Sequence, residues 1–202
     1  MSNKPFAESC EQNKQVILDV LEREFADARH VLEIGSGTGQ HAVFFARHLP
    51  HLIWQCSDRR ENLPGIQVWL DEAGLANTPA AIELDVLARD WPALSVDAVF
   101  SANAVHIMSW TAVEAMFNGI GRMLEENGRV CLYGPFNYAG RYTSESNARF
   151  DAWLKARDPQ SGIRDFAAIN ELARKIGLRP LGDHAMPANN RILVWQRVSV
   201  EP

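Results

Sequence analysis

The 202-residue chain is predicted to form an α/β fold, in which a doubly wound, mostly parallel sheet of seven strands ends in a C-terminal antiparallel hairpin strand. Three observations predict it. A buried strand, a glycine-rich turn and a helix follow one another over residues 30–49. Helices separate the strands that come after, which implies right-handed crossovers and a parallel sheet. Only a few residues separate the last two strands, and such a short link permits an antiparallel pair alone.

Each predicted strand is a short apolar run bounded by turn residues. Val31, Leu32 and Ile34 supply the first strand, and the second and third end at Asp58 and Asp85. The predicted strands cover residues 30–34, 52–57, 80–84, 97–101, 129–134, 178–186 and 191–198. Together they describe a Rossmann-like sheet, in which ligands lie beyond the carboxyl ends of the strands.

The predicted helices carry apolar residues at helical spacing, as Val16, Ile17, Val20 and Leu21 do in the first of them. Pro64 fits the first turn of the third helix. The predicted helices cover residues 13–25, 40–49, 61–72, 110–124, 147–156 and 166–176. The long polar region 135–162 holds only one of them, and loops of that length are usually functional or disordered.

Composition favours one globular domain over residues 1–202, because 47% of the residues are hydrophobic and 22% are charged. No apolar run reaches the ~20 residues of a membrane span, and no secretory signal is evident, so we expect a cytoplasmic protein. The three cysteines lie far apart, without the spacing of a metal site. A net charge of −5 without any long Lys/Arg run argues against a nucleic-acid partner. The oligomeric state stays open.

The glycine turn has the pattern E-x-G-x-G-x-G, with Glu33 followed by Gly35, Gly37 and Gly39. The dinucleotide fingerprint G-x-G-x-x-G would need its third glycine where Gln40 stands. A tight turn without a ligand is the alternative interpretation. The pattern resembles the first motif of class I S-adenosylmethionine-dependent methyltransferases, and this resemblance implies S-adenosyl-L-methionine as the cofactor.

The resemblance also implies roles for residues at the strand ends. Asp58 is expected to accept hydrogen bonds from the ribose hydroxyls, with a helix N-cap as the alternative. Asp85 is expected to bind the adenine amino group and the Val86 amide to meet the ring, with a plain turn as the alternative. The predicted cofactor-binding residues are Glu33, Gly35, Ser36, Gly37, Gly39, Asp58, Asp85, Val86, Asn103 and Asn13.

The fourth strand ends in Asn103 and His106, where transfer chemistry usually lies in the resembled superfamily. Enzymes that methylate exocyclic amines of nucleobases have Asp/Asn-Pro-Pro-aromatic at this place, and this chain lacks the prolines. Both residues are predicted to be catalytic. Asn103 would position cofactor or acceptor, and His106 would serve as a general base, since imidazole titrates near neutral pH. A purely structural histidine is the alternative.

A closer resemblance involves residues 5–14, 33–40, 103–110, 133–136 and 187–191, which are similar to the methyltransferase-like family catalogued as domain of unknown function 938. That family has an arginine before its Asn-Lys pair, where this chain has Gln12 before Asn13 and Lys14. The resemblance supports the fold and the cofactor but supplies no substrate. Residues 1–14 are predicted to close over the cofactor as a lid.

These observations predict an S-adenosylmethionine-dependent methyltransferase that acts on a small-molecule acceptor and uses no metal. Tyr133, Tyr138, Tyr142 and Trp110 are predicted to wall the acceptor pocket. Two alternatives remain: a binding protein of the same fold without transfer activity, and a nicotinamide-dependent reductase. Titration with S-adenosylhomocysteine and NADH separates them.

Overall fold

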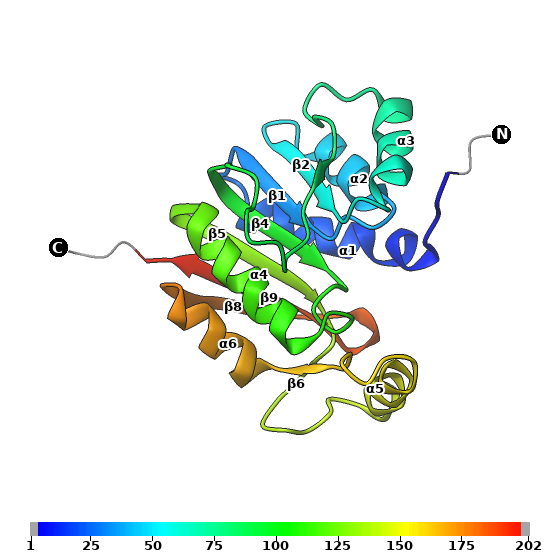
Figure 1. Cartoon of the computed structure of the whole chain (residues 1–202), viewed down its shortest axis with the longest axis vertical. Coiled ribbons are helices and arrows are strands. Elements are labelled where there is room, and N and C mark those ends of the chain that lie inside the picture. The colour runs from blue at the N-terminus through cyan, green and yellow to red at the C-terminus, as the bar shows by residue number, and fades with distance from the viewer. Residues whose placement is uncertain (1–3, 199–202) are drawn as a thin grey trace.

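The computed structural model describes residues 4–198 and contains the predicted seven-stranded sheet, in the order β3-β2-β1-β4-β5-β9-β8 (Figure 1). β1 to β5 are parallel, and β9 runs antiparallel to both β5 and β8, as the short link between the last two strands predicts. The strands are β1 (His30–Ile34), β2 (Ile53–Asp58), β3 (Ile82–Glu83), β4 (Val96–Ala102), β5 (Leu124–Gly134), β8 (Leu178–Met186) and β9 (Asn190–Arg197).

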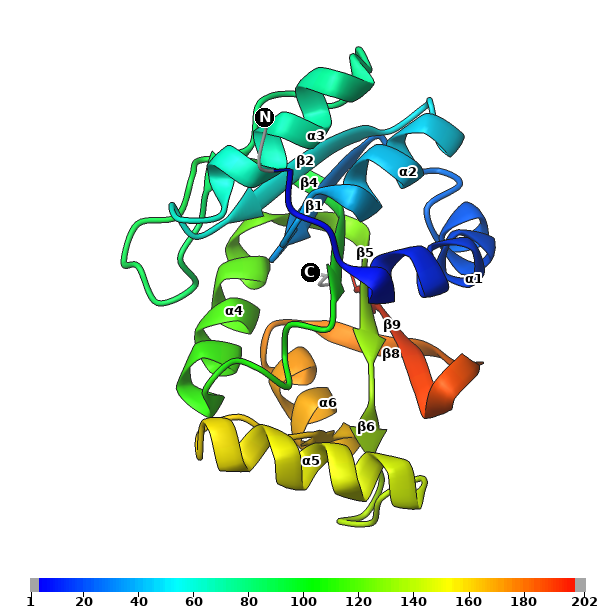
Figure 2. The ribbon, with the colours of Figure 1, turned by 90° about the vertical axis from the view of Figure 1, so that its right-hand side faces the viewer.

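Helices cover both faces of the sheet, and each face has its own apolar core. α1, α2 and α3 pack on one face, and α4 and α6 on the other (Figure 1). α5 lies apart from these layers, beyond the carboxyl end of β5 (Figure 2). The helices are α1 (Glu8–Glu24), α2 (Gln40–His48), α3 (Leu63–Ala73), α4 (Trp110–Met123), α5 (Glu145–Arg157) and α6 (Phe166–Lys175).

Several predicted boundaries were wrong, among them those of α1, β3 and β5, which begins at Leu124 and not at residue 129. α1 begins at Glu8 and not at residue 13, because its first turns are polar and lack the apolar stripe that marks the rest of the helix. β3 pairs with β2 over two residues only. A second small sheet was missed altogether, in which β6 (Phe136–Asn137) pairs in parallel with β7 (Arg164–Asp165). Strands this short carry no periodic signal in the sequence.

The carboxyl ends of β1, β2, β4 and β5 meet at one edge of the sheet, and hydrogen bonds between strand ends fix that edge. Ser57 accepts from the amides of Gly35 and Ser36 at 3.0 Å each, and the Ser101 hydroxyl donates to the Ile34 carbonyl at 2.7 Å. The glycine turn is therefore attached to β2, and the end of β1 that precedes it is attached to β4. Within residues 4–198, no helix is both long enough and apolar enough to cross a membrane.

Candidate functional site

The glycine loop between β1 and α2 turns on three left-handed glycines, with φ of +76° at Gly35, +59° at Gly37 and +88° at Gly39. Their surroundings differ. A Cβ on Gly39 would stand 3.2 Å from the backbone of Ile66, so this glycine lets α3 approach α2. A Cβ on Gly35 would stand 3.4 Å from that of Ala104, in the loop after β4. Gly37 faces open space, so a ligand can approach its bare backbone.

Asp58 ends β2 beside this loop and is almost buried. Its carboxylate accepts from the Gly37 amide at 2.7 Å, the Arg59 amide at 2.8 Å and the Asn62 side chain at 2.8 Å. The N-cap of α3 is Asn62, so Asp58 is not the helix cap that the alternative interpretation required. It fastens the glycine loop and stands next to the exposed Gly37.

Glu33 lies at the same edge but is buried in β1. Burial raises the pKa of its carboxyl to about 7, while hydrogen bonds from Trp54 and Ser36 act in the opposite direction. The Trp54 indole donates to the Glu33 carboxylate at 3.1 Å. The carboxyl thus titrates close to neutral pH, where a nearby cation would favour its charged form.

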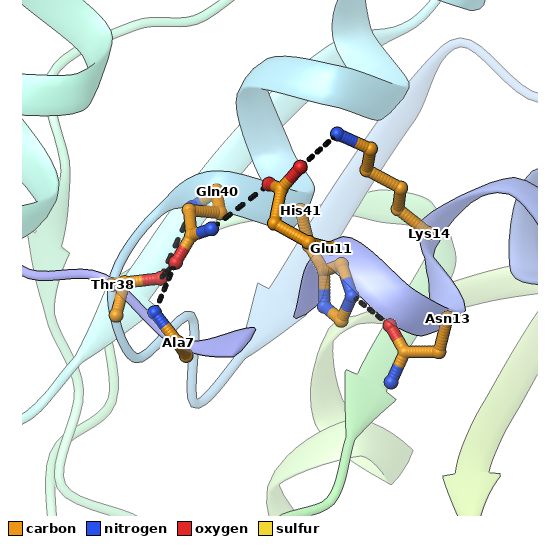
Figure 3. Close-up of polar contacts among 7 residues, drawn as sticks. All are labelled: Ala7, Glu11, Asn13, Lys14, Thr38, Gln40 and His41. Atoms are coloured by element: carbon orange, nitrogen blue, oxygen red, sulfur yellow. Dashed lines mark hydrogen bonds and ion pairs between the residues drawn. The ribbon is translucent and has the colours of Figure 1, made fainter. Parts of the chain in front are cut away.

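The chain before α1 is fastened to the glycine loop by Gln40 (Figure 3). The Gln40 side-chain oxygen accepts from the Ala7 amide at 2.6 Å and from the Thr38 hydroxyl at 3.0 Å, and its nitrogen donates to Glu11 at 2.9 Å. The residue that departs from the dinucleotide fingerprint therefore closes the N-terminal segment over the start of α2. Residues 1–3 of the predicted lid lie outside the described residues, and residues 8–14 form the first turns of α1.

Asn13 is held in the same cluster by His41 of α2, 2.7 Å away (Figure 3). Burial lowers the pKa of His41 to about 4, so the ring is neutral at neutral pH. In Figure 3 one end of the Asn13 amide meets His41 and the other points away from it. Asn13 also lines the main cavity, which puts this amide where a ligand can reach it.

Asp85 and Val86 follow β3, one strand away from Asp58. The Leu84 amide donates to the Asp58 carbonyl at 2.8 Å, so the two loops are in contact. Asp85 is exposed and accepts from the Leu87 amide at 2.9 Å, which is the turn geometry of the alternative interpretation. Val86 is buried below it.

Asn103 and His106 stand together after β4. Asn103 has a left-handed φ of +55° and donates its amide to the Tyr133 carbonyl at 2.8 Å. A Cβ on Gly134 would stand 3.5 Å from His106 Nδ1 and 3.7 Å from Asn103 Oδ1, so both side chains face one spot. His106 is 3% exposed, and its Nδ1 has no hydrogen-bond partner among residues 4–198. Burial first, and the Arg164 charge second, lower the pKa of His106 to about 4.

The turn that carries His106 is held by residues 161–164, which bond four carbonyls in a row. Arg164 donates to the carbonyls of Val105, at 3.1 Å, and of Met108. The Gly162 amide donates to the His106 carbonyl at 2.8 Å, and the Ser161 hydroxyl to the Ile107 carbonyl at 2.8 Å. We call these contacts the His106 clamp.

A cavity of about 970 Å³ opens beside Asn103 and His106. Its walls come from α1, the ends of β4 and β5, α5 and the β8–β9 turn. The lining residues are Ser9, Gln12, Asn13, Val16, Asn103, His106, Ile107, Tyr133, Pro135, Ser146, Asn147, Phe150, Trp153, Leu154, Arg157, Asp158, Ser161, Pro187, Ala188 and Asn190. Across the described part of the chain, no three His, Cys, Asp or Glu side chains gather as a metal site would require.

Comparison with models of known protein families assigns the sequence to one family. The family described as "Protein of unknown function (DUF938)" matches residues 4–197. The chain belongs to this family. The resemblance noted in the sequence is therefore confirmed over almost the whole DUF938 chain.

Solved structures share the fold of this DUF938 protein. An O-methyltransferase family protein from Burkholderia thailandensis superimposes with a TM-score of 0.81 at 19% identity, over 93% of this chain and 57% of that one. The S-adenosylmethionine-dependent methyltransferase SibL gives 0.80 at 24%, over 95% and 56%. Human N-acetylserotonin methyltransferase, in complex with S-adenosylmethionine, gives 0.78 at 13%, over 95% and 53%. The chain thus spans little more than half the length of these proteins.

The structure brings the predicted residues of the DUF938 protein into two groups. Glu33, the glycine loop and Asp58 gather around β1 and β2, with Asp85 and Val86 on the next loop. Asn13, Asn103 and His106 line the cavity. Of the four aromatic residues predicted to wall an acceptor pocket, only Tyr133 does so. The prediction was wrong for Tyr138, Tyr142 and Trp110, which lie outside the lining.

Phe150 and Trp153 of α5 supply the aromatic walls instead, and the sequence interpretation missed them. Residues 146, 147, 150, 153, 154 and 157 recur at helical spacing, so they share one face of α5. That stripe was visible in the sequence. Only the fold shows that it faces a cavity and not the core.

Proposed function

We propose that this DUF938 protein is an S-adenosylmethionine-dependent methyltransferase with a small-molecule acceptor. One observation carries the proposal: the open backbone of Gly37 and the cavity beside His106 belong to the same carboxyl edge of the sheet. A cofactor and an acceptor bound there would be neighbours, because Gly35 lies against the Ala104 side chain in the loop after β4.

The residues at this edge fit the cofactor. The space in front of Gly37 is one that a Cβ would fill, which suits close approach of a ligand. The Asp58 carboxylate suits ribose hydroxyls, and Asp85 with the Val86 amide suits adenine. Glu33 and Asn13 would serve the charged amino-acid end, which a carboxyl near its titration point and an amide can both bind.

When bound, S-adenosylmethionine supplies a methyl group on a sulfonium sulfur, and transfer joins that carbon to a lone pair of the acceptor while the carbon–sulfur electron pair returns to sulfur. The chain must then align the acceptor and exclude water, which can lower a barrier by several kcal/mol. Asn103 is suited to orient the acceptor. His106 is neutral above about pH 4, so its ring has a free lone pair for the acceptor proton, but the lowered pKa makes it a weaker base than the near-neutral imidazole that the sequence predicts.

The solved structures of the same fold support the assignment as far as their names go. Two are described as S-adenosylmethionine-dependent or S-adenosylmethionine-bound methyltransferases, and one as an O-methyltransferase family protein. At 13% to 24% identity, they share the fold with this chain. The reaction and the acceptor class are our proposal.

Calorimetric titration of the purified protein with S-adenosylhomocysteine and with NADH tests the cofactor. We expect S-adenosylhomocysteine to bind in the micromolar range and NADH not to bind, because the Gln40 side chain and Glu11 occupy the start of α2 where a dinucleotide needs a glycine and a free helix end. The reverse preference would refute the proposal.

Transfer itself is tested by screening small metabolites with S-adenosylmethionine labelled in its methyl group. Label in an extracted product identifies an enzyme. Tight S-adenosylhomocysteine binding without any labelled product, over a broad screen, would favour a binding protein of the same fold.

A further inference from the structure

The cavity wall formed by α5 is a ladder of stacked groups. The Phe150 ring meets the His106 ring edge-on, with centroids 5.4 Å apart and planes at 73°. The Phe150 and Trp153 rings are stacked at 5.8 Å and 18°. The Arg157 guanidinium lies over the Trp153 ring at 4.6 Å. A row of planar side-chain groups therefore runs from His106 along α5.

Large apolar side chains of this wall are left uncovered. Trp153 is 50% exposed and Ile107, on the loop after β4, is 58% exposed. Both line the same cavity, so their free surfaces face one concave space and not the open exterior alone. Concave sites with aromatic walls and a few polar groups are typical of small-molecule binding. A bound ring would cover this surface and gain its burial energy.

The charges around the cavity are few. Only Arg157 and Asp158 carry full charges among its lining residues, and they are adjacent and opposite. The other polar groups are neutral, such as Asn13, Asn147 and Asn190. A phosphate group is usually held by several cations or a free helix end. This cavity has a single lining cation, and Ser144 caps the N-terminus of α5. The first turn of α1, whose Ser9 lines the cavity, carries the acidic Glu8 and Glu11, which repel an anion there.

We propose that the methyl acceptor is a flat aromatic compound without a phosphate group, whose ring packs against Phe150 and Trp153 and whose nucleophilic atom faces His106. The volume of about 970 Å³ admits a molecule of several fused or linked rings. The inference rests on the proposed function, since only in a methyltransferase is the occupant of this cavity the acceptor.

Three probes test the ligand class by calorimetry without any cofactor present: naphthol, its saturated analogue decahydronaphthol, and naphthyl phosphate. We expect naphthol to bind, and decahydronaphthol and naphthyl phosphate to bind at least about fivefold more weakly. Decahydronaphthol lacks aromatic ring faces, and naphthyl phosphate adds a charge that the cavity does not match. Equal binding of decahydronaphthol, tighter binding of naphthyl phosphate, or no binding of naphthol up to its solubility limit would overturn the proposal.

The wall residue is tested with Trp153→Leu, which keeps an apolar side chain but removes the ring. Naphthol affinity should fall by about fivefold or more. Leu181→Ala is the control, because Leu181 of β8 is an exposed apolar residue outside the cavity lining, and it should leave naphthol binding unchanged. An unchanged affinity in Trp153→Leu would place the ring elsewhere. These naphthol titrations contain no cofactor, so their outcome does not depend on the cofactor. A protein that fails to bind S-adenosylhomocysteine in a separate titration would refute the proposed function and leave the naphthol results as they are.

Discussion

The two halves of the site are built in different ways. The proposed cofactor half is centred on one stretch, residues 33–41, whose backbone conformation forms the glycine loop, and Asp58, Asp85 and Val86 join it from the next two strand ends. The acceptor half gathers residues from α1, the ends of β4 and β5, α5 and the β8–β9 turn, which are distant in the sequence. The cofactor half is thus formed mainly by backbone geometry, and the acceptor half mainly by side chains. Substitutions should therefore act on them independently.

Gly37→Val should have the largest effect, because the branched side chain would fill the space that the ligand needs. We expect S-adenosylhomocysteine binding to fall below detection in calorimetry. The matched control is Gly74→Val at the end of α3, where φ is +56° and no atom lies within 4 Å of the added Cβ. Both variants carry the cost of a left-handed branched residue, about 1–2 kcal/mol, but only the first should lose binding. Retained binding in a folded Gly37→Val protein would move the cofactor elsewhere.

His106→Ala should lower turnover by ~10²-fold or more if the imidazole is the base. Cofactor affinity should hardly change, because the ring faces the acceptor side. The imidazole is protonated, and unable to act, only as the pH falls through about 4, so the acid limb of the wild-type pH–rate profile belongs there and not near neutrality. If this variant turns over at the wild-type rate, His106 is not a base, and the site would act only by positioning the reactants.

Asp58→Ala should weaken S-adenosylhomocysteine binding by about 1–3 kcal/mol, the cost of leaving hydrogen-bonded groups unpaired. Its melting temperature should also fall, since the Gly37 and Arg59 amides lose their acceptor. Asn62→Ala is the control, because it removes one bond of the same carboxylate without reaching the ribose. If both variants lose stability alike and neither loses affinity, Asp58 is structural.

Arg164→Gln should have the smallest effect, a rise in the His106 pKa, because the guanidinium charge disfavours the imidazolium. Burial is the larger cause of the low pKa and stays, so the rise should be partial. Arg164→Lys keeps the charge but loses the forked donors of the His106 clamp, and should leave the pKa low. NMR titration of the His106 ring measures both without a substrate. Equal pKa values in Arg164→Gln and wild type would remove Arg164 from the electrostatics of the site.

The sequence predicted the glycine loop and the main sheet well because their signal is local. Glycines at alternate positions after an apolar run specify a turn, and β1, α2 and the order of the main sheet agree with that prediction. The hydrogen bonds of the Gln40 side chain could not be predicted. Its departure from the dinucleotide fingerprint was visible, but its bonds to Ala7 and Glu11 depend on how α1 packs on α2.

The α5 wall of the proposed acceptor half was not predicted, although Asn103, His106 and Tyr133 were, because its contacts are long-range. Tyr142 looked like a wall residue, yet its hydroxyl donates to the buried Asp151 at 2.6 Å and holds α5 in place. Lys155 and the Ile163 amide bind the same carboxylate. The β6–β7 pair joins residues 136 and 164 across almost the whole connecting region. No periodicity in that region indicates such pairing.

The His106 clamp has a consequence for how substrate range can change in this family. Residues 161–164 hold the backbone of the turn, and of these Ser161 also lines the cavity, whereas residues 146–157 supply the aromatic part of the wall. An exchange of α5 side chains other than Phe150, whose ring contacts His106, can therefore reshape the wall while the imidazole keeps its place. In the proposed methyltransferase, the turn that holds the imidazole and most of the wall that would contact the acceptor thus belong to separate pieces of the chain, so the acceptor could change while the proposed reaction centre stays as it is.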